Sequence, residues 1–526
     1  VFKFYLQIWV LWGISAAVAL AHLLQRRVHW PAGWRRVWQT ALTLLLIGVA
    51  LYPVCASVGK VNDRWSASQP NGLDGMEYME TAHYSDGADL TLEYDRRAIV
   101  WLRENVQGSP VIAEANTPLY RWGNRISVYT GLPTLVGWDW HQKQQRAAVS
   151  GWIVDWALQD VRDLYASTDL ALKRQIIARY EVAYIYVGEL EQAYFGSDGL
   201  GALAEMEGSD LEVVYQDGPV TIYRVVDAQG LARAPTEEAS PFAEAQAGHG
   251  VLADLREWLS RHWVGRAVHA DGPAKEPSSD RADTHTTPDL MLDGPVDQLP
   301  VLRDRGWNRW IAGSAVGQAL CWWLVLQLIG LAAWPLARRI APHQGDGGYG
   351  LAKGLGLLVV SYLVWIGASL RLTRNTPTVA WAALALLALV GWLLARRPRP
   401  NAKPVAWRLI VLEEALFSAA FAAFVGVRLL NPDLWQPWFG GEKMMEIAIL
   451  NALNKSAYMP PYDPYFAGGY LNYYYYGQFI ANVLVKLTGV TPEVGFNLAV
   501  PTFFALTVGH VFTVGRQLAA RSATGR

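Results

Sequence analysis

Long uncharged apolar runs occur near the start of this chain and again throughout its second half. A run of about 20 such residues can cross the hydrocarbon core of a bilayer as a helix. The runs predict membrane-spanning helices at 4–24, 39–58, 312–336, 351–370, 377–395, 406–429 and 494–514. The region 60–310 has no run of this kind, and we expect it to lie in water.

The distribution of Lys and Arg between these runs predicts an orientation, because such residues collect in cytoplasmic loops. The loop after the first run contains the arginines Arg26, Arg27, Arg35 and Arg36. The loop 396–408 is also rich in arginine and lysine. With both loops in the cytoplasm, residues 59–310 and 431–490 become extracytoplasmic parts of a multi-pass protein of the cell membrane. Arg371 and Arg374, in a short outer loop, depart from this pattern.

The segment 473–488, YYYYGQFIANVLVKLT, could either span the membrane or lie on its surface. If it spans, the arginines after 514 end outside. If it lies flat, the run 494–514 leads inward and those arginines end in the cytoplasm. The segment is short, aromatic at its start and contains Lys486. These features are typical of a helix that lies in the interface, and we predict that placement.

The water-facing residues 59–227 are expected to form an α/β domain, because helical and β-rich patterns alternate from residue 90 onward. The predicted helices are 95–106, 142–165, 168–180 and 198–206, and the predicted strands are 110–115, 125–130, 182–188, 211–216 and 220–225. Residues 228–300 are rich in Ala, Pro, Gly, Asp and Glu. That composition indicates a disordered or loosely structured linker, with one short helix at 250–262.

Composition supports a membrane protein and argues against one class of partner. Only 17% of the residues are charged, and the chain has 25 tryptophans, a residue type that collects at membrane interfaces. A formal net charge of -1 argues against the basic surface that phosphate backbones require, so we expect no nucleic-acid partner. Cys55 and Cys321 both lie in apolar runs and show no metal-ligand spacing.

The densest polar cluster outside the membrane follows the run 406–429 and contains candidate catalytic residues. Glu442 and Glu446 are four positions apart, so a helix places both on one face. Lys443 lies beside them, and Asp463 follows in a proline-rich turn. Carboxylates at a membrane surface could take a proton from an acceptor hydroxyl while a cation binds a phosphate. The structural alternative is a solvated helix start with acids near its N-terminus.

Other features also have both a functional and a structural interpretation. The run of Tyr473, Tyr474, Tyr475 and Tyr476 could bind a sugar or lipid headgroup, or form an interfacial aromatic belt. Glu413 and Glu414 lie inside a predicted span, where carboxylates often serve a function, but close enough to its cytoplasmic end to reach water. In the α/β domain, Asp139 and His141 could belong to a site, although a lone histidine in a loop more often makes a structural hydrogen bond.

Three stretches together suggest a family. They are GGEKMMEIAILNAL with PPYDPYFAGGYLNYYYYGQFIANVLVKLTGVTPEVGFNLAVPTFFAL up to residue 506, VFKFYLQIW at 1–9, and TPLYRWGNRISVYTGLP to GWDWHQKQQR with YEVAYIYVGELEQAYF. The first resembles the start of the YYY membrane-protein family, which is named for its tyrosine run. The second resembles a motif near the end of that family's membrane region, and the third its C-terminal extracytoplasmic domain. The family is largely uncharacterised and is grouped with C-type (GT-C) glycosyltransferases.

In this chain the segments that resemble the tail of the family precede those that resemble its head. We therefore expect a fragment that spans the junction of two tandem units. Residues 1–58 would be the last transmembrane helices of a first unit, and 59–227 its extracytoplasmic domain. After the linker 228–300, residues 301–526 would begin a second unit, with about five transmembrane helices and an acidic outer loop at 431–490.

The resemblance implies a mainly α-helical, GT-C-like polytopic fold and a mechanism. Such enzymes move a sugar from a polyprenyl-phosphate donor on the outer face, and an acidic residue of the first outer loop acts as base or binds a divalent metal. By position, Glu442 and Glu446 are candidates for that role, with Asp463 next. Lys443 or Arg428 could hold the donor phosphate. The implied partners are the lipid bilayer, a lipid-linked sugar donor and the rest of the tandem protein.

Two other classes of function compete with this hypothesis. A non-catalytic envelope scaffold or polysaccharide-binding protein would use the tyrosine run and the α/β domain as contact surfaces. A transporter would need ionisable residues that face one another at mid-membrane, and the sequence offers Glu413 and Glu414. Convergence of Glu442, Glu446 and Asp463 on a cavity open to the outer leaflet would favour the enzyme, and divergence of their side chains into solvent would contradict the catalytic assignment.

Overall fold

The structure, a computed structural model, describes residues 2–64, 70–147, 152–226, 290–292, 294–302, 307–308, 313–342, 344–397, 404–435 and 441–524. Within these residues, six helices are long and apolar enough to cross a membrane. Their spans are Ala32–Lys60, Ala315–Ile340, Tyr349–Ser369, Pro377–Arg396, Trp407–Leu430 and Pro492–Ala520. Each coincides with a run predicted from the sequence. The remaining predicted run, at 4–24, forms the helix α1 (Phe2–Arg26), which is not among these six.

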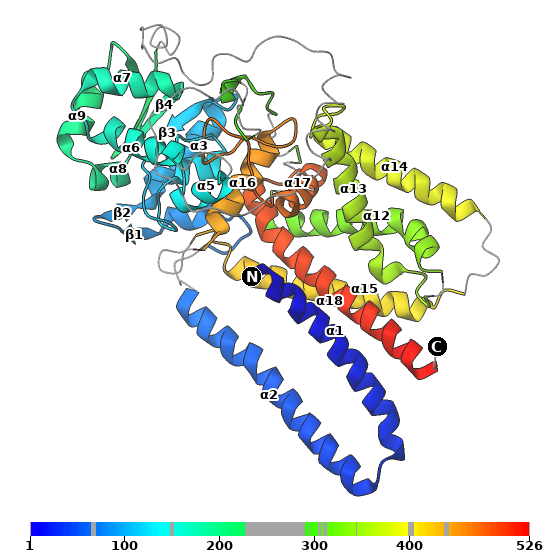
Figure 1. Ribbon diagram of the computed structural model, residues 1–526. Helices are drawn as coiled ribbons and strands as arrows, with labels where there is room; N and C mark the ends of the chain where they lie inside the picture. The colour runs from blue at the N-terminus through cyan, green and yellow to red at the C-terminus, as the bar shows by residue number, and fades with distance from the viewer. Residues whose placement is uncertain are drawn as a thin grey trace, which may run out of the picture.

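The membrane half is built around a bundle of long helices. They are α12 (Ala315–Ile340), α13 (Tyr349–Ser369), α14 (Pro377–Arg396), α15 (Trp407–Leu430) and α18 (Pro492–Thr524). α12, α13 and α14 pack against one another, α15 packs along α18, and α13 contacts both α15 and α18. α1 also packs along α18, and α2 (Ala32–Arg64) runs beside the bundle with its apolar side chains exposed (Figure 1). Exposed apolar side chains on a spanning helix are suited to contact with lipid.

Two short helices, α16 (Lys443–Lys455) and α17 (Tyr476–Thr488), lie in the loop between α15 and α18. α17 has 13 residues, about 20 Å at the helical rise, which is too short to cross a hydrocarbon core of about 30 Å. As predicted, the segment 473–488 does not span. Its helix packs against α12, α13, α14, α16 and α18, and the Lys486 ammonium is buried, where it donates to the carbonyl of Asn454 at 2.8 Å. α17 is therefore enclosed by protein, and the predicted placement on the membrane surface, with Lys486 in water, was wrong for this helix.

The turns and ends that are rich in arginine gather at one end of the bundle, away from the α/β domain (Figure 1). There the last turns of α18 lie beside the loop between α12 and α13. The side-chain amide of Gln344 donates to that of Gln517 at 2.7 Å, and Arg516 lies 3.6 Å from Asp346. α18 therefore ends on the same side as that loop, as the charge pattern predicts for a chain in which 473–488 does not span. The assignment of this side to the cytoplasm rests on the charge pattern.

An α/β domain occupies most of residues 70–226. Its four-stranded sheet has the order β3–β4–β6–β5, with β3 and β4 parallel and the other neighbours antiparallel. The strands are β3 (Val111–Ala113), β4 (Val182–Val187), β5 (Leu211–Asp217) and β6 (Val220–Val225), and a separate hairpin pairs β1 (His83–Ser85) with β2 (Asp89–Thr91). The helices are α3 (Leu92–Asn105), α4 (Arg125–Thr130), α5 (Asp139–Gln145), α6 (Trp152–Ala166), α7 (Leu170–Arg179), α8 (Glu189–Tyr194) and α9 (Ser197–Glu205).

Most elements of this domain agree with the predicted pattern, but the segment 125–130 does not. It was predicted to be a strand, and it forms the helix α4. The reason is a tertiary cap: the buried carboxylate of Glu114, at the end of β3, accepts hydrogen bonds from the backbone N–H groups of Ile126 at 2.7 Å and Ser127 at 2.8 Å. These bonds satisfy the free donors of the first helical turn, and Gly131, at φ 66°, ends the helix. The short helix predicted at 250–262 lies outside the described residues.

The α/β domain sits on the loop between α15 and α18 (Figure 1). α16 packs against α4, and the Asn451 side chain donates to the carbonyl of Val128 at 2.8 Å. The backbone N–H of Gly137 donates to the carbonyl of Tyr465 at 2.7 Å. One hydrophobic cluster continues from the domain through α16 into the bundle. Residues 70–226 and the loop therefore lie on the same side of the membrane. The α/β domain covers the end of α15, and we call it the roof domain.

Candidate functional site

The two cations that the sequence proposes for phosphate binding meet at the end of α15. Arg428, in the last turn, donates from Nη2 to the carbonyl of Asp433 at 3.3 Å, and Lys443 donates from Nζ to the same carbonyl at 3.2 Å. Arg428 also donates from Nε to the Asn497 side chain at 3.0 Å, which ties α15 to α18. The fold thus brings together two positive charges that are 15 positions apart.

Glu442 directly precedes Lys443 in the chain. Glu442 is exposed and directly precedes α16, whereas Glu446, one turn later, is half-buried. Burial raises the pKa of the Tyr120 hydroxyl, and the nearby Glu442 carboxylate and Tyr473 raise it further. Tyr120 belongs to the α/β domain, and its backbone carbonyl accepts a hydrogen bond from the Trp435 indole at 3.1 Å. The roof domain therefore contributes a phenol to the neighbourhood of Glu442.

Asp463 has surroundings that differ from those of the two glutamates. Its carboxylate is buried and forms an ion pair with Arg146 of the α/β domain at 3.0 Å. It also accepts from the backbone N–H of Tyr465 at 2.8 Å. Burial raises the pKa of Asp463, and the Arg146 guanidinium opposes that shift. A carboxylate with these partners has the surroundings of a structural ion pair between domain and loop, which favours a structural role over the catalytic role predicted from sequence.

The four tyrosines divide into two pairs. The rings of Tyr473 and Tyr474 lie 5.0 Å apart, and the Tyr474 side chain is 73% exposed. The hydroxyl of Tyr475 accepts a hydrogen bond from the Trp365 indole at 3.2 Å, and the Tyr476 ring packs edge-on against the same indole. The second pair therefore anchors the loop to α13. The first pair is the part of the run that a ligand could reach.

The structure adds polar residues that sequence reasoning missed. Arg103 of α3 binds both oxygens of Glu493, at 3.0 and 2.9 Å, and Asp74 lies beside this pair. Asp433, three residues beyond the end of α15, has a buried Oδ1 atom with no hydrogen-bond partner among the described residues. Its position as the first carboxylate after the span is a signal that the sequence contains. The pairing of Arg103 with Glu493 joins residues 390 positions apart, and local pattern does not reveal it.

His141, a candidate site residue of the α/β domain, is buried against aromatic rings. Its ring centre lies 5.4 Å from that of Trp138 and 6.1 Å from that of Tyr120. Asp139 stands in the first turn of α5, where an acid favours the helix N-terminus. Among the described residues, no three His, Cys, Asp or Glu side chains are grouped as ligands for a metal ion.

Substitution of Asp74 by asparagine is expected to change how stability depends on pH. Burial and the neighbouring Glu493 carboxylate raise the pKa of Asp74 to about 7, whereas an aspartate in the unfolded chain titrates near about 3.9. The folded protein therefore holds a proton that the unfolded chain releases in this interval, and stability falls as pH rises from about 4 to 7. Relative to the wild type, Asp74→Asn should gain a few degrees of melting temperature between about pH 5 and pH 8.

Thermal unfolding of the purified chain in detergent, followed by intrinsic tryptophan fluorescence across this pH range, measures the effect. Asp198→Asn, which changes an exposed aspartate in α9, is the matched control and should follow the wild-type profile. Parallel profiles for the wild type and Asp74→Asn would contradict the shifted titration.

Comparison with known proteins addresses the C-terminal third of the chain, which holds Arg428, Glu442 and Lys443. Residues 359–526 match a protein family. The family is described as "Uncharacterized membrane protein (DUF2298)". The matched segment includes α14, α15, α18 and the loop with Arg428, Glu442 and Lys443. No curated protein and no solved structure matches the chain. Together with the six candidate spans, the match identifies the chain as a multi-pass membrane protein.

Proposed function

We propose that the chain belongs to a membrane glycosyltransferase of the GT-C type, which transfers a sugar from a polyprenyl-phosphate donor to an acceptor hydroxyl at the end of α15. The observation that supports it most is the convergence of Arg428 and Lys443 on one carbonyl, with the Glu442 carboxylate one residue away from Lys443. Two cations on one carbonyl suit a phosphate, and an exposed carboxylate on the residue before Lys443 suits a proton acceptor.

The arrangement of elements also supports the proposal. The resemblance to GT-C enzymes implies a first outer loop whose short amphipathic helices lie at the membrane before the next span. Here α15 is followed by α16 and α17 and then by α18. The phosphate of a lipid donor is held at headgroup level, where the end of α15 lies if that helix spans the bilayer. The α/β domain above would limit the access of water to this level.

In the proposed reaction Glu442 takes the proton of the acceptor hydroxyl. The acceptor oxygen forms a bond to the anomeric carbon of the sugar, and the bond from that carbon to the donor phosphate oxygen breaks. The lipid phosphate leaves with the electron pair, and Lys443 and Arg428 stabilise its negative charge. The exposed Tyr474 and the partly buried Tyr473 beside it would contact the sugar or the lipid headgroup. We assign no residue to a divalent metal.

Substitution of Glu442 by glutamine is expected to lower the rate of sugar transfer at least about 100-fold, because loss of a general base typically costs that much or more. The measurement uses the full chain in proteoliposomes that contain radiolabelled polyprenyl-phosphate sugars, and it records transfer and donor hydrolysis. Lys443→Met should raise the KM for the donor and also lower kcat, since its charge binds the donor phosphate and stabilises the leaving phosphate.

Glu446→Gln is the matched control, because the same change is made one helical turn away; its transfer rate should stay within about threefold of the wild type. Melting temperature and elution volume establish that each variant is folded. Loss of transfer in Glu446→Gln but not in Glu442→Gln would overturn the assignment of the base. No turnover with any donor, or turnover indifferent to both changes, would overturn the proposed activity and favour a non-catalytic protein.

One feature of the surface favours that alternative, a scaffold that binds envelope polysaccharide. Trp140, Trp152 and Trp156 of the α/β domain are 58%, 51% and 59% exposed, and the rings of Trp152 and Trp156 lie 4.3 Å apart. An ion pair between Lys143 and Asp155 joins the two helices that bear them. Exposed aromatic rings beside polar groups form a suitable surface for sugar rings. Affinity electrophoresis in gels that contain cell-surface polysaccharide measures this binding, and it distinguishes a polysaccharide-binding scaffold from the enzyme.

A further inference from the structure

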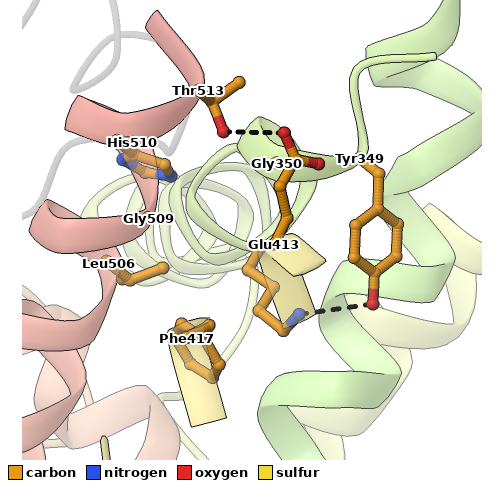
Figure 2. Close-up of a pocket in the computed structure, with 9 residues that line it drawn as sticks. Tyr349, Gly350, Glu413, Phe417, Leu506, Gly509, His510 and Thr513 are labelled. Atoms are coloured by element: carbon orange, nitrogen blue, oxygen red, sulfur yellow. Dashed lines mark hydrogen bonds between the residues drawn. The ribbon is translucent and has the colours of Figure 1, made fainter. Parts of the chain in front are cut away.

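A second polar site lies inside the helical bundle, at the end opposite to the α/β domain. A cavity opens between α13, α15 and α18 and is lined by Tyr349, Gly350, Lys353, Glu413, Phe417, Leu506, Gly509, His510 and Thr513 (Figure 2). Its volume of about 20 Å³ is enough for one water molecule or a small ion. A sugar or another organic solute does not fit. The ligand of this cavity must therefore be of the size of a water molecule or smaller.

Two glycines of α13 allow α18 to come close enough to form this cavity. A Cβ atom at Gly350 would lie 2.2 Å from the Thr513 hydroxyl oxygen, and a Cβ at Gly354 would lie 2.3 Å from the His510 ring. Small residues four apart let two membrane helices approach closely. The polar side chains of α18 are thus held directly against α13 and α15.

Glu414 is one of two adjacent glutamates on α15, and its charge is fully compensated. Lys353 donates to its carboxylate, Tyr349 donates to it at 2.7 Å, and Ser418 donates to it at 2.9 Å. Lys353 also lies over the rings of Tyr349 and Phe417. This group is therefore a closed ion pair with no need for a further ligand.

Glu413, the other glutamate, has different partners. Its side chain is almost completely buried, and Thr513 donates to Oε1 at 3.1 Å. Its Oε2 atom and the Oδ1 atom of the fully buried Asp346 receive no hydrogen bond from a donor among the described residues. Instead the two carboxyl groups share one cation, because Nη2 of Arg516 lies 3.6 Å from an oxygen of each. Two buried carboxyl groups that share a single cation repel each other unless one of them carries a proton.

The surrounding charges lead to the same conclusion. Asp346, Glu413 and Glu414 supply three carboxylates, and Lys353 and Arg516 supply two fixed positive charges, so one negative charge is left over when His510 is neutral. Arg516 lies 3.6 Å from both Asp346 and Glu413 and compensates only one of them. From α12, Arg338 packs against Gly347, next to Asp346, but among the described residues it forms no ion pair with Asp346 and is not counted with Lys353 and Arg516. An uncompensated charge inside a bundle is costly, and one bound proton removes it.

We propose that Asp346 and Glu413 form a proton-binding site that opens on the cavity between α13, α15 and α18. One proton is shared by the two carboxyl groups. The imidazole of His510 lines the same cavity, its Nε2 atom has no hydrogen-bond partner among the described residues, and it is the second proton acceptor. A water molecule in the cavity connects the two. A proton is preferred to a metal ion, because Arg516 already lies against both carboxylates and the described residues show no metal-ligand group.

The site has a consequence for the bundle. The backbone N–H of Gly350 ties Asp346 to the start of α13, Arg516 of α18 bridges Asp346 and Glu413, and Thr513 of α18 donates to Glu413 of α15. Loss of the proton would place two carboxylates in contact, and their repulsion would loosen this junction. α15 and α18 also carry Arg428 and Asn497 at the other end of the bundle. Proton binding is therefore placed to alter the packing of the two helices that hold the candidate transferase site.

Infrared difference spectroscopy of the full chain in lipid bilayers tests the proposal. Near neutral pH the wild type should show the C=O stretching band of a buried protonated carboxyl group. Glu413→Gln and Asp346→Asn should each abolish this band. Thr513→Val, which removes only the hydrogen bond to Glu413, should keep the band but shift its frequency. Arg516→Gln should keep the band to higher pH, because a nearby cation favours the ionised form.

Glu104→Gln, which changes an exposed carboxylate in α3, is the control. Its spectrum should show the same C=O band as the wild type. Three results would overturn the proposal: no such band in the wild type, a band that survives both Glu413→Gln and Asp346→Asn, or a band that sodium ions abolish at constant pH. The last result would identify a metal-cation site. The band shift in Thr513→Val and the altered titration in Arg516→Gln keep the test decisive if a charge-removing variant does not fold.

Discussion

Substitution of Asp463 by asparagine is expected to lower the free energy of unfolding by about 3–5 kcal/mol, because it leaves a charged Arg146 buried without its counterion. In the wild type the two side chains are 2% and 1% exposed and pair at 3.0 Å. The Arg146 guanidinium also lies 4.1 Å from the centre of the Phe466 ring, so it has no path to water. The pair joins the roof domain to the loop that holds the candidate site, and its loss should separate the two.

Chemical denaturation of the purified chain, followed by tryptophan fluorescence, measures this loss, and limited proteolysis reports on the separation. Glu212→Gln is the control, since it removes the carboxylate of a surface pair with Arg224 that is half exposed on both sides; such a pair contributes less than about 1 kcal/mol. An Asp463→Asn variant of unchanged stability that has lost sugar transfer would restore the catalytic role predicted from sequence.

Substitution of Arg125 by methionine is expected to lower the free energy of unfolding by at least as much as Asp463→Asn does. It leaves two buried carboxylates without a partner, whereas Asp463→Asn leaves one buried cation. Arg125 is fully buried in the α/β domain. It binds Asp95 at 2.7 Å and Glu191 at 2.8 Å, and its guanidinium lies 4.9 Å from the centre of the Tyr186 ring. The loss of one partner of such a group typically costs about 3–5 kcal/mol, and here two charges lose their partner at once. We expect the α/β domain to unfold at ordinary temperature.

The measurement is the near-ultraviolet circular dichroism of the purified chain, which reports on the packing of the aromatic side chains of this domain. Arg174→Met is the matched control, because Arg174 is 41% exposed and its pair with Asp210 lies at the surface of the same domain. Its cost should stay below about 1 kcal/mol. Equal effects of Arg125→Met and Arg174→Met would show that the buried group is not an essential part of the fold.

The membrane topology was predictable from sequence because its causes are local. A run of uncharged residues that is long enough for the bilayer defines a span wherever it occurs, and the six candidate spans coincide with such runs. The segment 473–488 was predicted not to span from its length and its lysine, and α17 has 13 residues. The alternation of helical and β-rich patterns also predicted four strands of the sheet. In each case the decisive interaction lies within the segment or between the segment and its solvent.

The assignments that failed or stayed open depend on partners far along the chain. The segment 125–130 has the composition of a strand, but the carboxylate of Glu114 caps it as a helix. Asp463 looked like an accessible acid, and Arg146, 317 positions away, makes it a buried ion pair. Glu413 and Glu414 looked like a single acidic pair, and packing gives Glu414 a lysine and Glu413 a second carboxyl group.

The sequence by itself therefore determined the six candidate membrane spans and where carboxylates and cations are dense. Only the tertiary structure decided which of those charges meet. It brought Arg428 and Lys443 to one carbonyl and Asp346 to Glu413. The physical reason is range: hydropathy acts on each segment separately, whereas hydrogen bonds and ion pairs act over about 3–4 Å between side chains that only packing can bring together.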